Sequence, residues 1–386
     1  MKIKDLDFPY LDYSHSNVSL ANSILKAFGA PTHHNTLPEA DALLAEGYTN
    51  VIIMLLDAMG ANILRDDLPE DSFFRTHLQT VFSSVYPPTT VASTTSVNCG
   101  LVPSEHAWLG WDCYYPAIDR CVTVFLNRDT VTGEPIEDYN VAGRFTPYPK
   151  LTDQVTKAGQ GKGYIVSPFD GSFIASREDR CQKLLELCAT PEKKYIYFYD
   201  EEPDSTMHPT GIHSEKSITA LRTLEARIRQ LCCDLETQKA RLEAEGKPVG
   251  KTLLLITADH GHIDSAGVCL KDYPDVLECL RMTPTIEPRT LNFFVKPERL
   301  NDFPVIFNAH FGDKFLLVTR QEALDSDLFG PGQRHKDLPA MLGDYLALAV
   351  SDLSIYSTRK ETELFIGVHA GLTKEEVEIP LIAVKI

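Results

Sequence analysis

The sequence predicts an α/β fold with a mostly parallel central sheet and helices on both faces. Continuous apolar runs of strand length recur along the chain, and such runs are typical of strands that are covered on both faces. Longer segments with apolar residues at helical spacing lie between these runs. Because strands and helices alternate in this way, we expect a parallel sheet between two layers of helices.

The predicted strands share a continuous apolar character with little or no alternation. They span residues 51–56, 163–167, 194–199, 251–257 and 345–350, and residues 379–382 form a closing strand. The longest predicted helix covers about 213–245, where Leu221, Leu224 and Ile228 belong to a series of apolar residues three or four apart.

The length of 386 residues suits one large domain, and 43% hydrophobic residues can form a sizeable core. We expect residues 1–386 to form a single domain. A small subdomain is expected around 281–335, where prolines are mixed with short apolar stretches. The sequence says nothing about the oligomeric state.

The formal net charge of −17 argues against a nucleic-acid backbone or an anionic membrane as the main partner. A small anionic substrate stays compatible with this charge, because a bound divalent metal can reverse the local field. No apolar run approaches the roughly 18 residues of a membrane helix. The first residues lack the apolar region of a secretory signal, and the nine cysteines show no Cys-x-x-Cys spacing. We therefore expect reduced thiols and a cytoplasmic location.

Carboxylates follow three of the predicted strands directly. Asp57 follows the first strand, 200–204 is an acidic segment after another, and Asp259 comes just after a third. In parallel sheets ligands bind beyond the carboxyl ends of the strands. Clustered carboxylates repel one another unless a cation joins them, so this edge of the sheet is a candidate metal site.

Two of these segments also carry histidines. Asp204 and His208 are four residues apart, so both can face one metal if the segment is helical, although a capping Asp beside an unrelated surface His would look the same. Asp259 and His260 can both reach a metal if the chain turns sharply, and Gly261 permits that turn. A capping Asp in an ordinary turn is the alternative. His262 is expected to support the site or face solvent rather than to bind the metal.

A hydroxyl-rich segment, 83–96, supplies a candidate nucleophile. Pro87 and Pro88 precede a run of Thr and Ser residues and favour the start of a helix there. A Thr at a helix N-terminus lies where backbone N–H groups favour an anion such as phosphate. A nearby metal can lower the pKa of such a hydroxyl enough to make it a nucleophile. A simple capping segment is the alternative.

The ordered set of motifs resembles the alkaline phosphatase superfamily, and most closely its nucleotide pyrophosphatase/phosphodiesterase-like branch. Thr90 stands ten residues before the Gly-Leu-x-Pro element 100–103, and the Glu-Glu-Pro-Asp element 201–204 continues to His208. The Asp-His-Gly element is 259–261, and the segment 367–373 carries His369. The resemblance spans about residues 50–386. This sequence departs from the pattern at Ala58 and Ala370, where the family commonly has Gly. It also departs at Ser93, where the phosphodiesterases usually have an Asn near the phosphate.

The resemblance implies a two-metal hydrolase of phosphate esters, either a phosphodiesterase or a phosphatase, that works through a phospho-threonine on Thr90. Zn²⁺ is the expected metal, and Mn²⁺ also suits the oxygen-rich set. The substrate would be a small phosphorylated molecule such as a nucleotide, bound near Ser93 and Trp111. One ion would be held by Asp204, His208 and His369, and the other by Asp57, Asp259, His260 and the Thr90 oxygen.

Several alternatives stay open at this point. His335 rivals His369 as the last ligand, whereas His106 and His310 are expected to be structural. Trp108 and Asp112 could line the substrate pocket together with Trp111. A phosphomutase, a sulfatase or phosphonate hydrolase-like enzyme, and a non-catalytic metal-binding module are the other functions considered. No Cys-x-Pro-x-Arg segment surrounds Thr90, which argues against a sulfatase.

Overall fold

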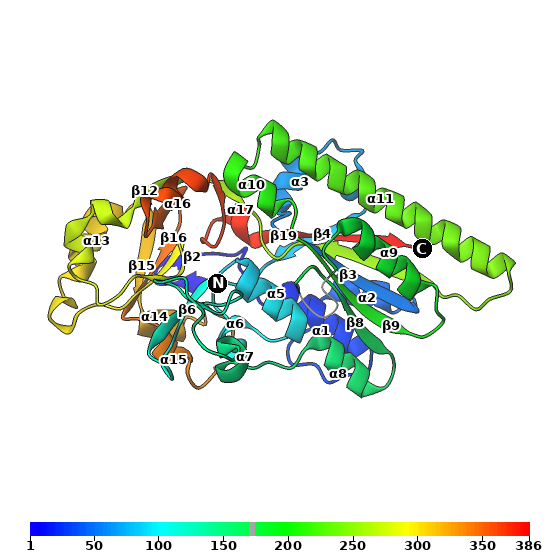
Figure 1. Ribbon diagram of the computed structural model, residues 1–386, viewed down its shortest axis with the longest axis horizontal. Coiled ribbons are helices and arrows are strands. Elements are labelled where there is room, and N and C mark those ends of the chain that lie inside the picture. The colour runs from blue at the N-terminus through cyan, green and yellow to red at the C-terminus, as the bar shows by residue number, and fades with distance from the viewer. Residues whose placement is uncertain (170–173) are drawn as a thin grey trace.

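The computed structural model describes residues 1–169 and 174–386, which form two lobes that lie side by side, each built on a β-sheet (Figure 1). The larger lobe contains a six-stranded sheet of order β4-β19-β10-β3-β9-β8. Its strands are β3 (Asn50–Leu56), β4 (Leu78–Ser83), β8 (Lys162–Val166), β9 (Lys194–Asp200), β10 (Thr252–Thr257) and β19 (Glu378–Lys385).

Four adjacent strands of this sheet, β10, β3, β9 and the edge strand β8, run parallel to one another. The other two, β19 and β4, are antiparallel to their neighbours. The mostly parallel sheet predicted from the sequence is therefore confirmed. Leu55 lies opposite Tyr199 on β9 and Thr257 on β10, so the three strands end level with one another. Their carboxyl ends consequently deliver the acidic residues to one edge, as expected.

Helices cover both faces of this sheet. The helices α1 (Asn17–Ala27), α5 (Thr90–Cys99) and α8 (Leu151–Ala158) contact one another on one face. On the other face α11 (Glu215–Ala244) contacts α9 (Arg177–Cys188), and Figure 1 shows these two above the sheet and α1 and α8 below it. The long helix predicted around 213–245 is α11, whose buried stripe includes the predicted apolar series.

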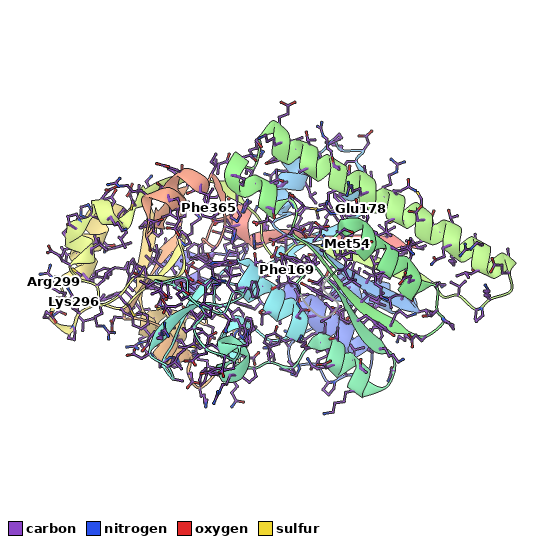
Figure 2. All side chains as sticks on the ribbon, viewed as in Figure 1. Met54, Phe169, Glu178, Lys296, Arg299 and Phe365 are labelled. Carbon is purple, nitrogen blue, oxygen red and sulfur yellow. The ribbon has the colours of Figure 1, made fainter. Side chains whose placement is uncertain are left out.

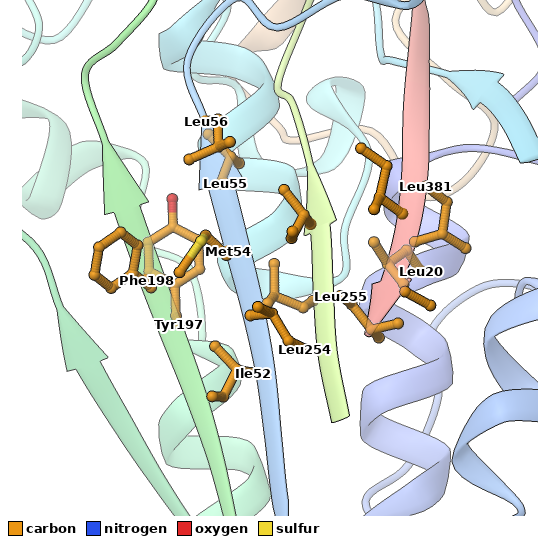
Figure 3. Close-up of a cluster of buried hydrophobic side chains, with 14 of the residues drawn as sticks. Leu20, Ile52, Met54, Leu55, Leu56, Tyr197, Phe198, Leu254, Leu255 and Leu381 are labelled. Atoms are coloured by element: carbon orange, nitrogen blue, oxygen red, sulfur yellow. The ribbon is translucent and has the colours of Figure 1, made fainter. Parts of the chain in front are cut away.

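The core of the larger lobe explains the continuous apolar runs. Every residue of β3 is buried, because side chains on both of its faces meet helices or neighbouring strands. Figure 3 shows side chains of four neighbouring strands packed together, among them Met54, Phe198, Leu255 and Leu381. Each such fully buried side chain stabilises the fold by about 1.5–3 kcal/mol.

The smaller lobe contains a seven-stranded sheet of order β15-β16-β14-β13-β5-β6-β7, in which every pairing is antiparallel. Its strands are β5 (Asp112–Tyr115), β6 (Arg120–Thr123), β7 (Arg128–Asp129), β13 (Thr285–Glu287), β14 (Thr290–Phe293), β15 (Phe315–Thr319) and β16 (Tyr345–Ala349). The segment around 281–335 lies in this lobe together with strands from 112–129.

The apolar run at 345–350 is a strand, but it is β16 of this antiparallel sheet rather than part of the parallel one. The continuous apolar pattern of this run predicted a parallel strand, but it arises here because both faces of β16 are covered. Leu346 and Leu348 pack into one hydrophobic cluster, whereas Ala347 and Ala349 pack into another. A run buried on both faces is thus not restricted to parallel sheets.

The connecting elements complete the two lobes. Those at the junction are α10 (Asp204–Thr210), β11 (Ile263–Asp264), β12 (Ala266–Cys269), β17 (Leu353–Tyr356), α16 (Arg359–Leu364), β18 (Gly367–Val368) and α17 (Lys374–Val377). The other helices are α2 (Pro38–Leu44), α3 (Ala61–Asp67), α4 (Phe73–Thr76), α6 (Pro103–His106), α7 (Val141–Phe145), α12 (Pro274–Leu277), α13 (Phe303–Phe311), α14 (Arg320–Asp325) and α15 (Leu338–Met341). Across residues 1–169 and 174–386, no helix is both long and apolar enough to cross a membrane.

Candidate active site

The site residues lie at the carboxyl edge of the parallel strands. Asp57 directly follows β3, Asp204 begins α10 shortly after β9, and Asp259 comes two residues after β10. Thr90 is the first residue of α5, as the proline-preceded hydroxyl segment predicted. His369 follows β18 and reaches the same place from the C-terminal part of the chain.

The first cluster consists of Asp57, Asp259 and His260, which are all buried and offer ligand atoms within 4.8 Å of one another. The Nε2 atom of His260 lies 3.3 Å from Asp57 Oδ1 and 3.6 Å from Asp259 Oδ2. Thr90 Oγ1 lies 3.2 Å from the same nitrogen. Asp57 Oδ1 and Asp259 Oδ2 are buried without a hydrogen-bond partner, although buried polar atoms nearly always have one.

The second cluster consists of Asp204, His208, His262 and His369, again with ligand atoms within 4.8 Å of one another. The two oxygens of Asp204 each lie 3.2 Å from an imidazole nitrogen, Oδ2 from His208 Nε2 and Oδ1 from His262 Nε2. The rings of His369 and His260 stack with their centroids 3.9 Å apart, so the two clusters lie next to each other.

Three of the imidazoles are oriented by backbone carbonyls. The Nδ1 atoms of His208, His260 and His369 lie 2.8, 3.0 and 3.2 Å from the carbonyl oxygens of Gly367, Gly261 and Pro88. A carbonyl only accepts, so each Nδ1 carries the proton and each Nε2 keeps its lone pair for the cluster. Histidines that bind metals are commonly fixed in this way.

The charges of the clusters are strongly coupled. Burial, followed by the charges of Asp259 and Asp204, raises the pKa of Asp57 well above its usual value. Burial also raises the pKa of Asp259. For Asp204 burial acts in the same direction, but His208 and His262 outweigh it and hold the pKa well below the usual value. Two neighbouring carboxylates that resist ionisation are stabilised as anions when a cation lies between them.

This arrangement fits two divalent ions. Each cluster joins carboxylate oxygens to imidazole nitrogens, and each contains a buried carboxylate oxygen that lacks a hydrogen bond. Oxygen and nitrogen donors of this kind suit Zn²⁺ and related divalent metals.

The turns that present the ligands hold unusual backbone conformations. Ala58 has φ 62° and Ala370 has φ 82°, both in the left-handed region that glycine adopts most easily. These are the two positions where the resembled family commonly has Gly. Gly261 differs from our expectation, because its φ lies outside this region; instead, a Cβ there would approach the carbonyl oxygen of Glu375 to 1.9 Å. The Asp-His-Gly turn therefore needs glycine for close packing.

Ser93 does not face the substrate side of the site. It is fully buried, its hydroxyl donates to the Asp259 carbonyl at 2.7 Å, and it accepts from Asn17 Nδ2 at 2.5 Å. Ser93 lies on α5 three residues after Thr90, so it points into the fold beneath the site. The sequence predicts that Ser93 contacts the substrate, and its buried position disagrees with that prediction.

A cavity of about 430 Å³ opens beside Thr90, Asp204, His208 and His369. Trp111 lines it, as expected, and so does Asp112, whereas Trp108 is buried elsewhere and donates its Nε1–H to the Thr146 carbonyl. The remaining wall was not predicted from the sequence. It comes from β13, β14, β17, α16 and the residue after α16, and it includes Glu287, Tyr356, Glu361 and Phe365. No spacing rule links these segments to the metal motifs.

The structure also shows where the other candidate histidines lie. The structure brings His369 into the second cluster and places His335 outside it, on a loop beside Ser104. His106 is buried against Ser96, and His310 pairs with Asp275 away from the clusters.

His262 is fully buried within the second cluster, which excludes the solvent-facing alternative and agrees with the expected supporting role beside Asp204. Both of its ring nitrogens lack a hydrogen bond of good geometry. The second histidine of Asp-His-Gly-His was the signal that could have found it.

The sequence profile of the type I phosphodiesterase/nucleotide pyrophosphatase family matches residues 51–280, which is more than half of the chain. The chain belongs to this family. The family consists of two-metal enzymes, and the chain is accordingly a phosphoric ester hydrolase with candidate metal clusters where such an enzyme needs them. The resemblance inferred from the motifs is thereby confirmed.

Solved structures show the same fold. Murine ectonucleotide pyrophosphatase/phosphodiesterase 5, in an inactive form in complex with AMP, matches with a TM-score of 0.64 and 17% identity over 86% of this chain and 87% of that chain. The murine protein without that complex gives the same values. The human protein matches with a TM-score of 0.66 and 14% identity over the same shares of both chains. No curated protein matched the sequence of this chain.

Proposed function

We propose that this chain hydrolyses small phosphodiesters by attack of the Thr90 hydroxyl on phosphorus, through a threonine-bound intermediate. The observation that carries the proposal is the position of Thr90 Oγ1, which lies 3.2 Å from His260 Nε2 at the start of α5, beside both clusters. The family match favours the phosphodiesterase branch over the phosphomutase and sulfatase alternatives.

The proposed ligands of one ion are Asp57, Asp259, His260 and the Thr90 oxygen. Those of the other are Asp204, His208 and His369, and His262 of the same cluster is proposed either as a fourth donor or as the residue that orients Asp204. Zn²⁺ suits these sets of oxygen and nitrogen donors, and Mn²⁺ is the alternative. Bound there, two such ions supply a lowered hydroxyl pKa at the nucleophile and positive charge for the phosphoryl oxygens.

The chain itself supplies position and orientation. The N-cap of α5, Thr89, makes no side-chain capping bond among the described residues, so the backbone N–H groups of the first turn favour a phosphoryl oxygen beside Thr90. Tyr199 donates its hydroxyl hydrogen bond to Asp57 Oδ2 and so fixes the carboxylate that faces Thr90. The Pro88 carbonyl orients His369 from the segment that leads into Thr90, which ties the two clusters to the nucleophile.

The chemical step forms one bond and breaks another. The Thr90 oxygen bonds to phosphorus and its hydroxyl proton passes to water, while the bond from phosphorus to the leaving oxygen breaks and that oxygen takes a proton from water. A water molecule then attacks phosphorus as the bond from phosphorus to the Thr90 oxygen breaks, one proton of this water restores the Thr90 hydroxyl, and a phosphate monoester is released. In-line displacement of this kind depends mainly on positioning and electrostatic stabilisation.

Thr90→Ala tests the proposal, with Thr94→Ala as the matched control. Thr94 lies one turn later on α5, and its hydroxyl donates to the Thr90 carbonyl. We expect Thr90→Ala to lower hydrolysis of bis-p-nitrophenyl phosphate by at least about 10³-fold while bound metal is largely retained. Thr94→Ala should stay within a few-fold of the wild type. Full activity of Thr90→Ala would refute the assignment. A comparison of p-nitrophenyl phosphate with the diester then distinguishes a phosphatase from a phosphodiesterase.

A further inference from the structure

His369 lies on a loop at the junction of the two lobes. Phe365, labelled in Figure 2, lies between the two lobes just after α16, and its ring contacts the His208 imidazole with the centroids 5.0 Å apart. The chain then forms β18 and reaches His369 directly after it. The geometry of the second cluster therefore depends on the contacts that hold this loop.

The backbone of the loop holds a conformation that needs support from its surroundings. Ala370, the residue after His369, is fully buried and has φ 82°, in the left-handed region that residues with a Cβ rarely adopt. Such a conformation persists only where the surrounding structure fixes it. A contact that fixes Ala370 consequently also fixes the backbone that presents His369.

A buried hydroxyl of the smaller lobe supplies such a contact. Thr290 is the first residue of β14, is fully buried, and donates its Oγ1 hydrogen to the Ala370 carbonyl at 2.5 Å. The Ala349 carbonyl at the end of β16 accepts from the Leu372 N–H at 2.7 Å. Because β14 and β16 pair with each other, neighbouring strands of one sheet hold the loop at two points.

A second buried hydroxyl completes the hydrogen bonding of Thr290. The Tyr86 hydroxyl oxygen lies 2.5 Å from Thr290 Oγ1. Since a hydroxyl carries one hydrogen and that of Thr290 goes to a carbonyl, Tyr86 is the donor in this pair. Tyr86 is fully buried, and burial raises the pKa of its hydroxyl, so it keeps the proton that the bond needs. Hydrogen bonds joined in such a chain strengthen one another.

The chain of hydroxyls begins on the segment that leads to the nucleophile. Tyr86 precedes Thr90 on this segment, and Pro88 lies between them. The Pro88 carbonyl accepts from His369 Nδ1 at 3.2 Å. The segment thus reaches the loop twice, directly through Pro88 and indirectly through Thr290. These two contacts set the position of the His369 imidazole relative to Thr90.

We propose that Thr290 is a positioning residue for the second cluster, and that the Tyr86–Thr290–Ala370 hydrogen bonds hold His369 where it can bind an ion. Thr290 belongs to neither cluster and does not line the cavity, so it acts through the backbone of Ala370. The proposal rests on the proposed function, because it requires that His369 binds one of the two ions.

Zinc binding tests the proposal independently of turnover. The whole chain is freed of metal with a chelator and titrated with Zn²⁺ in equilibrium dialysis, and the wild type should bind two ions. Thr290→Val keeps the branched shape but removes the donor to Ala370 and the acceptor of Tyr86. We expect the affinity for one ion to fall by about 10–100-fold, as when the outer partner of a metal ligand is removed. The other ion should bind as in the wild type.

Two companion variants distinguish positioning from a loss of stability. Thr290→Ser keeps the hydroxyl and should bind both ions as the wild type does. Thr252→Val is the matched control, because Thr252 is also a buried strand threonine and its Oγ1 accepts from Asn50 Nδ2 at 2.9 Å. It lies at the opposite end of β10 from Asp259, so Thr252→Val should lower the urea midpoint and leave both zinc affinities unchanged.

The route through the backbone has its own test. Ala370→Gly, added to Thr290→Val, should restore part of the lost zinc affinity, because glycine adopts the left-handed region without strain. Tyr86→Phe breaks the hydrogen bonds at their start and serves if Thr290→Val does not fold. It should weaken the same ion by about two- to tenfold, the range of one net hydrogen bond.

The outcomes separate the two proposals. A zinc site that weakens in Thr290→Val and Tyr86→Phe but not in Thr290→Ser supports the positioning role. Unchanged affinity in Thr290→Val, or in Tyr86→Phe if Thr290→Val does not fold, overturns it, as does an equal loss in Thr252→Val. A wild type that binds fewer than two Zn²⁺ ions overturns the role together with the two-metal assignment. Full hydrolysis by Thr90→Ala, with the zinc results as expected, refutes the proposed nucleophile alone.

Discussion

The buried pair of Arg289 and Glu376 joins the two lobes behind the active site. Both side chains are fully buried, with Nε and Oε1 2.7 Å apart. Glu376 Oε1 also accepts from the Gly371 N–H at 2.7 Å, and Oε2 accepts from Thr373 Oγ1 at 2.6 Å. Gly371 lies two residues after His369, so this carboxylate holds the loop that presents that imidazole.

Glu376→Gln keeps the shape of the side chain and leaves the Arg289 charge without its counter-charge. Breaking a buried ion pair from one side costs about 3–5 kcal/mol, and we expect that loss in the free energy of unfolding. Because the loop carrying His369 loosens, metal affinity should fall as well. Urea unfolding followed by circular dichroism measures the first effect, and metal titration measures the second.

The effect also depends on pH in a defined direction. Burial would raise the pKa of Glu376, but Arg289 and the hydrogen bonds outweigh it and lower the pKa below the usual 4.5. The stability contributed by the ionised carboxylate is therefore present above pH 4.5 and is lost as the pH falls through the folded pKa. The difference between the wild type and Glu376→Gln should shrink over that acidic range.

Glu375→Gln is the matched control, because Glu375 is the exposed neighbour on α17, and it should change stability by less than about 0.5 kcal/mol. A loss below about 1 kcal/mol in Glu376→Gln, similar to that of the control, would refute the reasoning about the pair.

Two further substitutions examine the site itself. His262→Gln should lower metal affinity at the Asp204 cluster by about 10–100-fold in equilibrium dialysis, whether His262 binds the ion or orients Asp204, and unchanged affinity would reduce it to a packing residue. Ser93→Ala should cost about 1–3 kcal/mol in urea unfolding, because it removes one of the two hydroxyl donors to the Asp259 carbonyl and takes away the acceptor of Asn17 Nδ2. Its KM should stay within about threefold of the wild type, whereas a large rise in KM without loss of stability would restore Ser93 as a substrate contact.

Much of the larger lobe could be predicted because its signals are local. A strand such as β3 is apolar throughout, and the register of parallel neighbours then places the residues that follow at one edge. Asp57, Asp204 and Asp259 could be assigned to one place for this reason.

The smaller lobe and the cavity wall could not be predicted in the same way. The strand β16 is as apolar as a parallel strand because two separate clusters cover it. Glu287 and Phe365 line the same cavity as Thr90 through the pairing of segments that are far apart in the chain. His262 was underestimated because a sequence does not show whether an imidazole beside a ligand turns inwards, and Ser93 was misplaced because its helix rotates the hydroxyl into the fold.

The central claim is that Thr90 forms a covalent bond to phosphorus during turnover. Acid quenching of the metal-loaded enzyme during hydrolysis of bis-p-nitrophenyl phosphate, followed by digestion and peptide mass spectrometry, tests it directly. The account predicts a p-nitrophenyl phosphoryl group on Thr90 in the wild type and no adduct in Thr90→Ala. An adduct on another residue, or steady turnover by Thr90→Ala at the rate of the wild type, would contradict it.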